Sequence, residues 1–189
     1  LTGAGRSFIA GADISEFGQK SDGPDLHTTL KDIEFSKKPV LAAINGTALG
    51  GGLETALVCN YRMGTEKAIV GLPEVNLGLL PGAGGTQRLP RLIGPSQALK
   101  MMLAGTPMSA KKALQQGVID AISENSLIDD AIAFLQEKIG LETHPKVRDK
   151  NEKVLEARGD DNVLAEAKAL ASKTRRGQFA PGQIISCVE

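Results

Sequence analysis

The chain has 189 residues, with 22 lysines and arginines balanced by 22 aspartates and glutamates, and 41% of its residues are hydrophobic. This length and composition fit one globular domain with a small appendage and exclude a disordered chain. A net charge of zero argues against a nucleic-acid surface, and 3% aromatic residues argue against a base-stacking platform.

The first third of the chain alternates apolar runs with glycine-rich joints. Residues 1–3 resemble the end of a strand already under way, so we expect a fragment whose preceding strands are missing. Residues 39–44 form an apolar run that ends at Asn45-Gly46, which predicts a buried strand followed by a tight turn. A mostly apolar helix is expected over 50–59, with three glycines in its first turn.

Short strands and helices follow in the middle of the chain. Further strands are expected over residues 60–65, 68–72 and 118–122. Helices are expected over 95–104 and 109–116, because each segment opens with a start signal and ends at a glycine. The middle of the chain is therefore expected to be α/β.

Beyond Glu124 the composition of the sequence changes, and charged, amphipathic segments with few glycines follow. Helices are expected over 127–139, 147–158 and 163–175, with solvated charged faces. We therefore divide the chain into a glycine-rich α/β core, residues 1–125, and a helical tail or linker, residues 126–189.

Several kinds of site are not expected. Cys59 and Cys187 cannot form a disulfide framework, and we expect both to be reduced. His27 and His144 are isolated, so we expect surface residues and neither a metal site nor a Ser–His pair. No apolar run is long enough to span a bilayer, and no signal peptide is visible.

Two carboxylates stand out against apolar surroundings. Glu54 follows the glycine triplet Gly50-Gly51-Gly52, and Glu74 precedes a largely uncharged loop. Desolvation raises the pKa of a carboxyl group toward the range useful for proton transfer. The plainer interpretation is that Glu54 complements a helix N-terminus and that Glu74 is a solvated loop charge.

The glycine triplet supplies a third element, because it opens a helix whose first N–H groups lack partners. A phosphate cradle and an oxyanion hole are both compatible with such a turn. The phosphate cradle is the weaker hypothesis, because no Lys-Ser or Lys-Thr follows the glycines and no G-x-G-x-x-G occurs in the chain. For the same reason, a dinucleotide-binding domain is a poor alternative for this stretch.

Three segments together resemble the successive signatures of the crotonase (enoyl-CoA hydratase/isomerase) family. They are residues 8–14 (FIAGADI), 45–54 (NGTALGGGLE) and 72–89 (LPEVNLGLLPGAGGTQRL). The resemblance covers about residues 1–125 and implies a spiral of strand–strand–helix units followed by a C-terminal helical region, with the N-terminal strands missing.

A less specific resemblance involves residues 92–95 (LIGP), the helical tail and residues 175–182 (RRGQFAPG). These are similar to the hydratase part of bifunctional enoyl-CoA hydratase/3-hydroxyacyl-CoA dehydrogenases. The resemblance implies that NAD is needed only by a dehydrogenase part outside this chain, and that the hydratase reaction needs no cofactor.

The family resemblance also implies roles for particular residues. The backbone N–H groups of Ala12 and Gly51 would form an oxyanion hole for an acyl-CoA thioester, and Ala10 and Ile14 would border the CoA. Glu54 would deprotonate water for attack on trans-2-enoyl-CoA, and Glu74 would protonate the neighbouring carbon. The presence of both glutamates favours hydration over the isomerase reaction, which relies on the equivalent of Glu74.

Two alternatives remain: an enoyl-CoA isomerase, and a non-catalytic acyl-CoA-binding module in which the glutamates are structural. The implied partners are an acyl-CoA substrate and either a second copy of the chain or a thiolase-type protein. The implied compartment is the cytoplasm for a bacterial protein and the peroxisome for a eukaryotic one. Acyl chain length and oligomeric state do not follow from the sequence.

Overall fold

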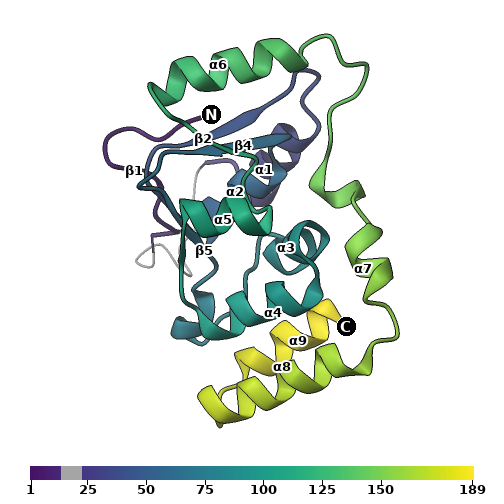
Figure 1. Cartoon of the computed structure of the whole chain (residues 1–189). Coiled ribbons are helices and arrows are strands. Elements are labelled where there is room, and N and C mark those ends of the chain that lie inside the picture. Colours follow the sequence, from purple (N-terminus) through teal and green to yellow (C-terminus); the bar gives the residue numbers. More distant parts are fainter. Residues whose placement is uncertain (14–22) are drawn as a thin grey trace.

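The computed structural model describes residues 1–13 and 23–189 (Figure 1). Its strands form two sheets. One sheet has the order β1-β3-β5-β6 and contains β1 (Ser7–Ile9), β3 (Thr47–Leu49), β5 (Ile69–Gly71) and β6 (Met108–Ser109). The other has the order β2-β4-β7 and contains β2 (Leu41–Ile44), β4 (Tyr61–Gly64) and β7 (Ala121–Ile122).

The two sheets are built from a repeated unit. The chain runs through one strand of each sheet in turn and then through a helix, as in β2, β3 and α2 (Gly51–Val58). In the next unit β4 pairs in parallel with β2, and β5 pairs in parallel with β3. Leu41 lies opposite Tyr61 and Thr47 opposite Ile69, so each turn of the spiral takes about 20 residues. The strand–strand–helix spiral expected from the sequence is therefore present.

Helices cover the sheets and fill the space between them. They are α1 (Leu26–Glu34), α2, α3 (Gly85–Ile93), α4 (Pro95–Ala104), α5 (Ala110–Gln116), α6 (Leu127–Lys138), α7 (Glu152–Glu156), α8 (Asp161–Thr174) and α9 (Ala180–Val188). Two short 3₁₀ helices are η2 (Glu74–Leu77) and η3 (Val147–Asp149). Fully buried Ile44, Leu53 and Leu57 lie in the main hydrophobic core.

Most expected elements in the middle of the chain are confirmed within a residue or two at each end. The helix expected over 95–104 is α4, and the strand expected over 60–65 is β4. Within 118–122 only Ala121–Ile122 forms a strand. The single helix expected over 147–158 is wrong, because η3 and the short α7 occupy that segment.

Sequence analysis missed several of the described elements, among them β1, α1, β3, η2 and α3. The strands β1 and β3 have three residues each, too few to show alternation. The helix α3 contains Pro90, which ordinarily marks a helix boundary, and begins after the left-handed Gly84. These elements are stabilised by tertiary contacts and carry little local signal.

The tail packs onto the core. Helix α6 lies across β2 and β4, and α8 and α9 lie against α4 at the opposite end of the molecule (Figure 1). Val147, Ala167, Ile184 and Ile185 are buried in the main hydrophobic core. The domain boundary near Glu124 stays a prediction. Within the described residues, no helix has both the length and the apolar character needed to cross a membrane.

Candidate active site

Three neighbouring parallel strands bring the predicted site segments together. The order β1-β3-β5 places the carboxyl ends of these strands side by side. Residues 10–12 follow β1, Gly50 and α2 follow β3, and η2 follows β5 after two residues. The amide of Gly50 donates to the carbonyl of Gly71 at 3.0 Å and joins two of these ends. Carboxyl ends of parallel strands commonly form binding sites in α/β proteins.

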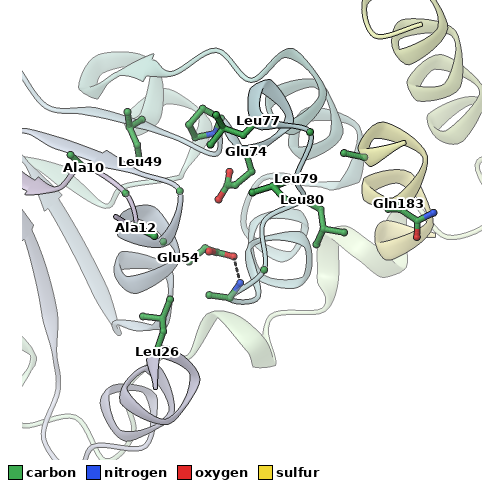
Figure 2. Close-up of a pocket in the computed structure, with 18 of the residues that line it drawn as sticks. Ala10, Ala12, Leu26, Leu49, Glu54, Glu74, Leu77, Leu79, Leu80 and Gln183 are labelled. Atoms are coloured by element: carbon green, nitrogen blue, oxygen red, sulfur yellow. Dashed lines mark hydrogen bonds between the residues drawn. The ribbon is translucent and has the colours of Figure 1, made fainter. Parts of the chain in front are cut away.

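A cavity of about 680 Å³ lies at this edge (Figure 2). Its lining includes five of the six predicted site residues: Ala10, Ala12, Gly51, Glu54 and Glu74. The sixth, Ile14, lies outside the described residues. Figure 2 shows the side chains of Glu54 and Glu74 pointing into the same space, from α2 and η2 respectively.

Glu54 is buried, with 3% of its surface exposed, and two amides bind it. Its Oε1 accepts hydrogen bonds from the amide of Ala83 at 2.7 Å and from the amide of Gly85 at 2.8 Å. Desolvation raises the pKa of Glu54, while these two hydrogen bonds and the positive charge of Arg88 oppose the rise. The side chain thus accepts hydrogen bonds from amides at the start of α3, while the residue itself lies in the first turn of α2.

Glu74 is half-buried and differently surrounded. Its Oε2 is buried and has no hydrogen-bond partner among residues 1–13 and 23–189. Desolvation and, to a smaller degree, the negative charge of Glu54 together raise the pKa of Glu74 to about 7. Glu74 is therefore not the solvated loop charge of the plainer interpretation.

The pKa of both carboxyl groups is raised, but the surroundings of the two groups differ. Amide donors stabilise the ionised form of Glu54, whereas burial without a partner favours the neutral form of Glu74. A reaction that removes one proton and delivers another needs a general base and a general acid close together. Because Glu54 acts on the pKa of Glu74, their titrations are coupled.

Glycines leave room for both carboxyl groups. A Cβ at Gly50 would lie 3.1 Å from Oε1 of Glu74, and Gly50 has a φ of +54°. A Cβ at Gly85 would lie 3.0 Å from Oε1 of Glu54 and 2.9 Å from side-chain atoms of Leu72 and Pro81. The glycine-rich joints that the sequence shows are thus the places where a side chain would crowd the carboxylates.

Sequence analysis missed part of the cavity wall. Four large apolar side chains at its rim are more than 40% exposed: Leu26, Leu77, Leu79 and Phe179. Ala180 and Gln183 of α9 also line the cavity, so the tail forms part of the wall. No motif marks these tail residues, because their place depends on how α9 packs.

The histidines and cysteines lie in different surroundings. Over residues 1–13 and 23–189, no group of three or more potential ligand side chains could hold a metal ion. His27 is exposed as expected but lines the cavity. His144 is partly exposed and lies against Tyr61, with Nδ1 3.3 Å from the phenol oxygen. Cys59 and Cys187 are free thiols, the first buried and the second exposed.

Comparison with known sequences identifies relatives over the whole chain. The family described as enoyl-CoA hydratase/isomerase matches residues 1–176. The chain is 42% identical to the peroxisomal bifunctional enzyme of Danio rerio and 40% identical to the fatty acid oxidation complex subunit alpha of Shewanella frigidimarina. Both alignments cover 100% of this chain but only 26% and 28% of those proteins, so the chain spans about a quarter of their length.

Solved structures agree with these relatives. An enoyl-CoA hydratase from Bacillus anthracis is 34% identical, with a TM-score of 0.67 over 96% of this chain and 80% of that one. An enoyl-CoA hydratase subunit from Geobacillus kaustophilus is 35% identical, with a TM-score of 0.65 over 92% and 68%. The expected crotonase-like fold is therefore confirmed.

Proposed function

The chain belongs to the enoyl-CoA hydratase/isomerase family, and from this membership we propose that it adds water to trans-2-enoyl-CoA thioesters. The observation that carries the proposal is the pair of carboxyl groups in one cavity. Two amides bind Glu54, and one oxygen of Glu74 is buried without a hydrogen-bond partner among the residues that the structure describes. A hydration needs a base for water and an acid for the neighbouring carbon, and this pair can supply both.

In this proposal the thioester oxygen binds between the N–H groups of Ala12 and Gly51. Gly51 is the first residue of α2, and the first amides of a helix have no partner within the helix. As water attacks, negative charge develops on the thioester oxygen, and amides already in place stabilise it without reorganisation. Ala10 and Ile14 would border the CoA moiety.

Glu54 then removes a proton from water as the oxygen attacks Cβ of the enoyl group. The carbon–carbon π electrons move toward the thioester to form an enolate. As the enolate collapses, Cα takes a proton from Glu74, and the product carries hydroxyl on Cβ and hydrogen on Cα. The reaction leaves Glu54 protonated and Glu74 ionised, and proton exchange with solvent restores the starting state.

The apolar rim of the cavity is compatible with an acyl-CoA substrate. Leu26, Leu77 and Phe179 present apolar surface next to the two carboxyl groups. Burying such surface against a fatty acyl chain is favourable at about 25 cal/mol per Å². The two carboxyl groups thus suit the reactive enoyl thioester group, and the apolar wall suits the acyl chain.

The names of the relatives suggest the context of this reaction. We propose that the chain is the hydratase part of a bifunctional hydratase/3-hydroxyacyl-CoA dehydrogenase in fatty acid oxidation. NAD would serve the dehydrogenase part, and this chain contains no G-x-G-x-x-G that fits it. A second copy or a thiolase-type partner, and a bacterial cytoplasm or a eukaryotic peroxisome, belong to the same proposal.

The test is substitution of each carboxyl group by its amide. We expect Glu54→Gln and Glu74→Gln, made in the full protein, each to lower kcat for hydration of crotonyl-CoA at least about 100-fold. Glu66→Gln, at an exposed turn between β4 and β5, is the matched control and should retain the activity. Full activity in both site variants would refute the proposed chemistry.

Parallel assays separate the alternatives. An isomerase would convert 3-enoyl-CoA faster than 2-enoyl-CoA, and Glu54→Gln would spare that reaction while Glu74→Gln abolished it. A non-catalytic module would bind acyl-CoA in a calorimeter without converting either substrate.

A further inference from the structure

The guanidinium of Arg88 connects two parts of the protein next to Glu54. From α3 its Nε and Nη2 donate to the two carboxylate oxygens of Glu34 on α1, at 3.0 and 2.9 Å. Its Nη1 donates to the carbonyl oxygen of Ala83 at 3.2 Å. Ala83 is also the residue whose amide binds Glu54. Arg88 thus binds the carbonyl side of the turn at residues 83–85, whose amides bind Glu54.

The turn at residues 83–85 needs this support because of its shape. Gly84 has a φ of +97°, and a Cβ placed there would lie 2.1 Å from Nη1 of Arg88. The guanidinium therefore packs directly on the glycine. In this conformation the amides on both sides, from Ala83 and Gly85, converge on a single oxygen of Glu54.

Glu34 of α1 fixes the position of the Arg88 guanidinium. Its side chain is 2% exposed, and a buried carboxylate is stable only when it is paired. A two-point pair with Arg88 fixes the plane of the guanidinium as well as its position. Arg148 of η3 adds a third contact to Glu34 at 3.3 Å, but its side chain is 49% exposed.

Arg88 also acts on Glu54 through its charge. The positive charges of Arg88 on α3 and of His27 on α1 lower the pKa of Glu54, against the larger effect of desolvation. Glu74, on η2, is electrostatically coupled to the same group. Of these neighbours, Arg88 is the permanently charged cation.

We propose that Arg88, fixed by Glu34, is a positioning residue that holds the 83–85 turn so that two amides keep Glu54 oriented and ionised for attack on water. This inference rests on the proposed hydratase function. It assigns a function to the Arg88–Glu34 pair, which does not line the catalytic cavity.

Three variants test the inference by their pH profiles of hydration. In Arg88→Gln we expect kcat to fall about 10- to 100-fold with little change in KM, because a small misplacement of a catalytic group has effects of this size. The acidic limb of the kcat/KM profile should move to higher pH, because the charge that favours ionised Glu54 is lost. Arg88→Lys keeps the positive charge but loses the two-point hydrogen bonding to Glu34. We therefore expect kcat to fall while the acidic limb stays near that of the wild type.

Arg148→Gln is the matched control, because it removes a cation from the same Glu34 carboxylate at a half-exposed position. It should leave kcat and the acidic limb unchanged. Circular dichroism and binding of a 3-hydroxyacyl-CoA product show which variants are folded. If folded Arg88→Gln lost thermal stability but kept the wild-type kcat and acidic limb, the pair would be structural and the inference wrong.

Failure of the inference differs from failure of the proposed function. Loss of activity in Glu54→Gln together with a wild-type profile in Arg88→Gln would refute only the role of Arg88. Full activity in Glu54→Gln would refute the proposed function itself.

Discussion

At the scale of single residues, the site shows how two glutamates acquire different properties from their surroundings. Glu54 is more deeply buried than Glu74, yet its two amide hydrogen bonds favour the charge that burial opposes. Glu74 has a buried oxygen without a hydrogen-bond partner in the described part of the chain, and desolvation raises its pKa to about 7. Hydrogen bonding, in addition to burial, therefore distinguishes the surroundings of the two carboxyl groups.

The raised pKa of Glu74 predicts a pH-dependent stability. Its folded pKa of about 7 lies above its ordinary value of 4.5, so between these values the unfolded chain releases a proton that the folded chain retains. This contribution therefore destabilises the fold as pH rises from about 4.5 to 7. We expect Glu74→Gln to be more stable than the wild type at pH 8 by about 1–2 kcal/mol, allowing for its partial exposure, and equally stable at pH 4.

Urea unfolding followed by circular dichroism at several pH values measures this difference. Glu66→Gln removes an exposed carboxylate and should reproduce the wild-type pH dependence. Equal stabilities of Glu74→Gln and the wild type at pH 8 would contradict the raised pKa.

At the scale of elements, two neighbouring glycines in the first turn of α2 differ in how much space a side chain would have. A Cβ at Gly52 would lie 2.0 Å from the carbonyl oxygen of Ile9, which belongs to the backbone of β1. Of the atoms that the structure describes, a Cβ at Gly51 would meet only the side chain of Leu26, at 3.7 Å, which is an ordinary contact. Gly52 therefore sets how closely the helix approaches β1, and so how close the amide of Gly51 comes to residues 10–12.

This difference predicts unequal effects of alanine within the triplet. Gly52→Ala should destabilise the protein by about 2–3 kcal/mol or more, because the clash is with backbone that cannot move aside without disturbing β1. Gly51→Ala should change stability by less than about 1 kcal/mol, since alanine favours the helix and space exists for its methyl group. The two free energies of unfolding, measured side by side, test the assignment, and equal effects would contradict it.

At the scale of the whole molecule, the helical tail completes the cavity. Ile184 and Ile185 of α9 are buried in the main core, while Phe179, Ala180 and Gln183 of the same segment line the cavity. Helix α9 packs against α3, α4 and α8 (Figure 1). Packing of the tail and shape of the cavity are thus coupled through one helix.

This coupling predicts a combined effect of Ile184→Ala. Removing the buried side chain should destabilise the protein by about 2–5 kcal/mol and raise KM for enoyl-CoA by loosening the cavity wall. Ile128→Ala, at a 46% exposed position on α6, is the control and should change both quantities little. Thermal unfolding and steady-state kinetics measure the two effects; separate unfolding of the tail, with the core unaffected, would contradict the coupling.

The sequence by itself determined the α/β character, the helix α4 with its glycine stop, and the two glutamates spaced by one turn of the spiral. These features are local, because helix signals and glycine-rich turns act over a few residues. The family resemblance added the expectation of a shared site for residues 10, 12, 51, 54 and 74, and the structure places them around one cavity. Their catalytic roles stay predictions.

Only the tertiary structure decided which groups surround each glutamate. The amides of Ala83 and Gly85 reach Glu54 from 29 and 31 residues away, and Arg88 meets Glu34 across 54 residues. Three-residue strands and a proline-containing helix form because neighbouring elements pack on them. The protonation states that the chemistry requires depend on these distant contacts, because desolvation and hydrogen bonding arise only when the chain has folded.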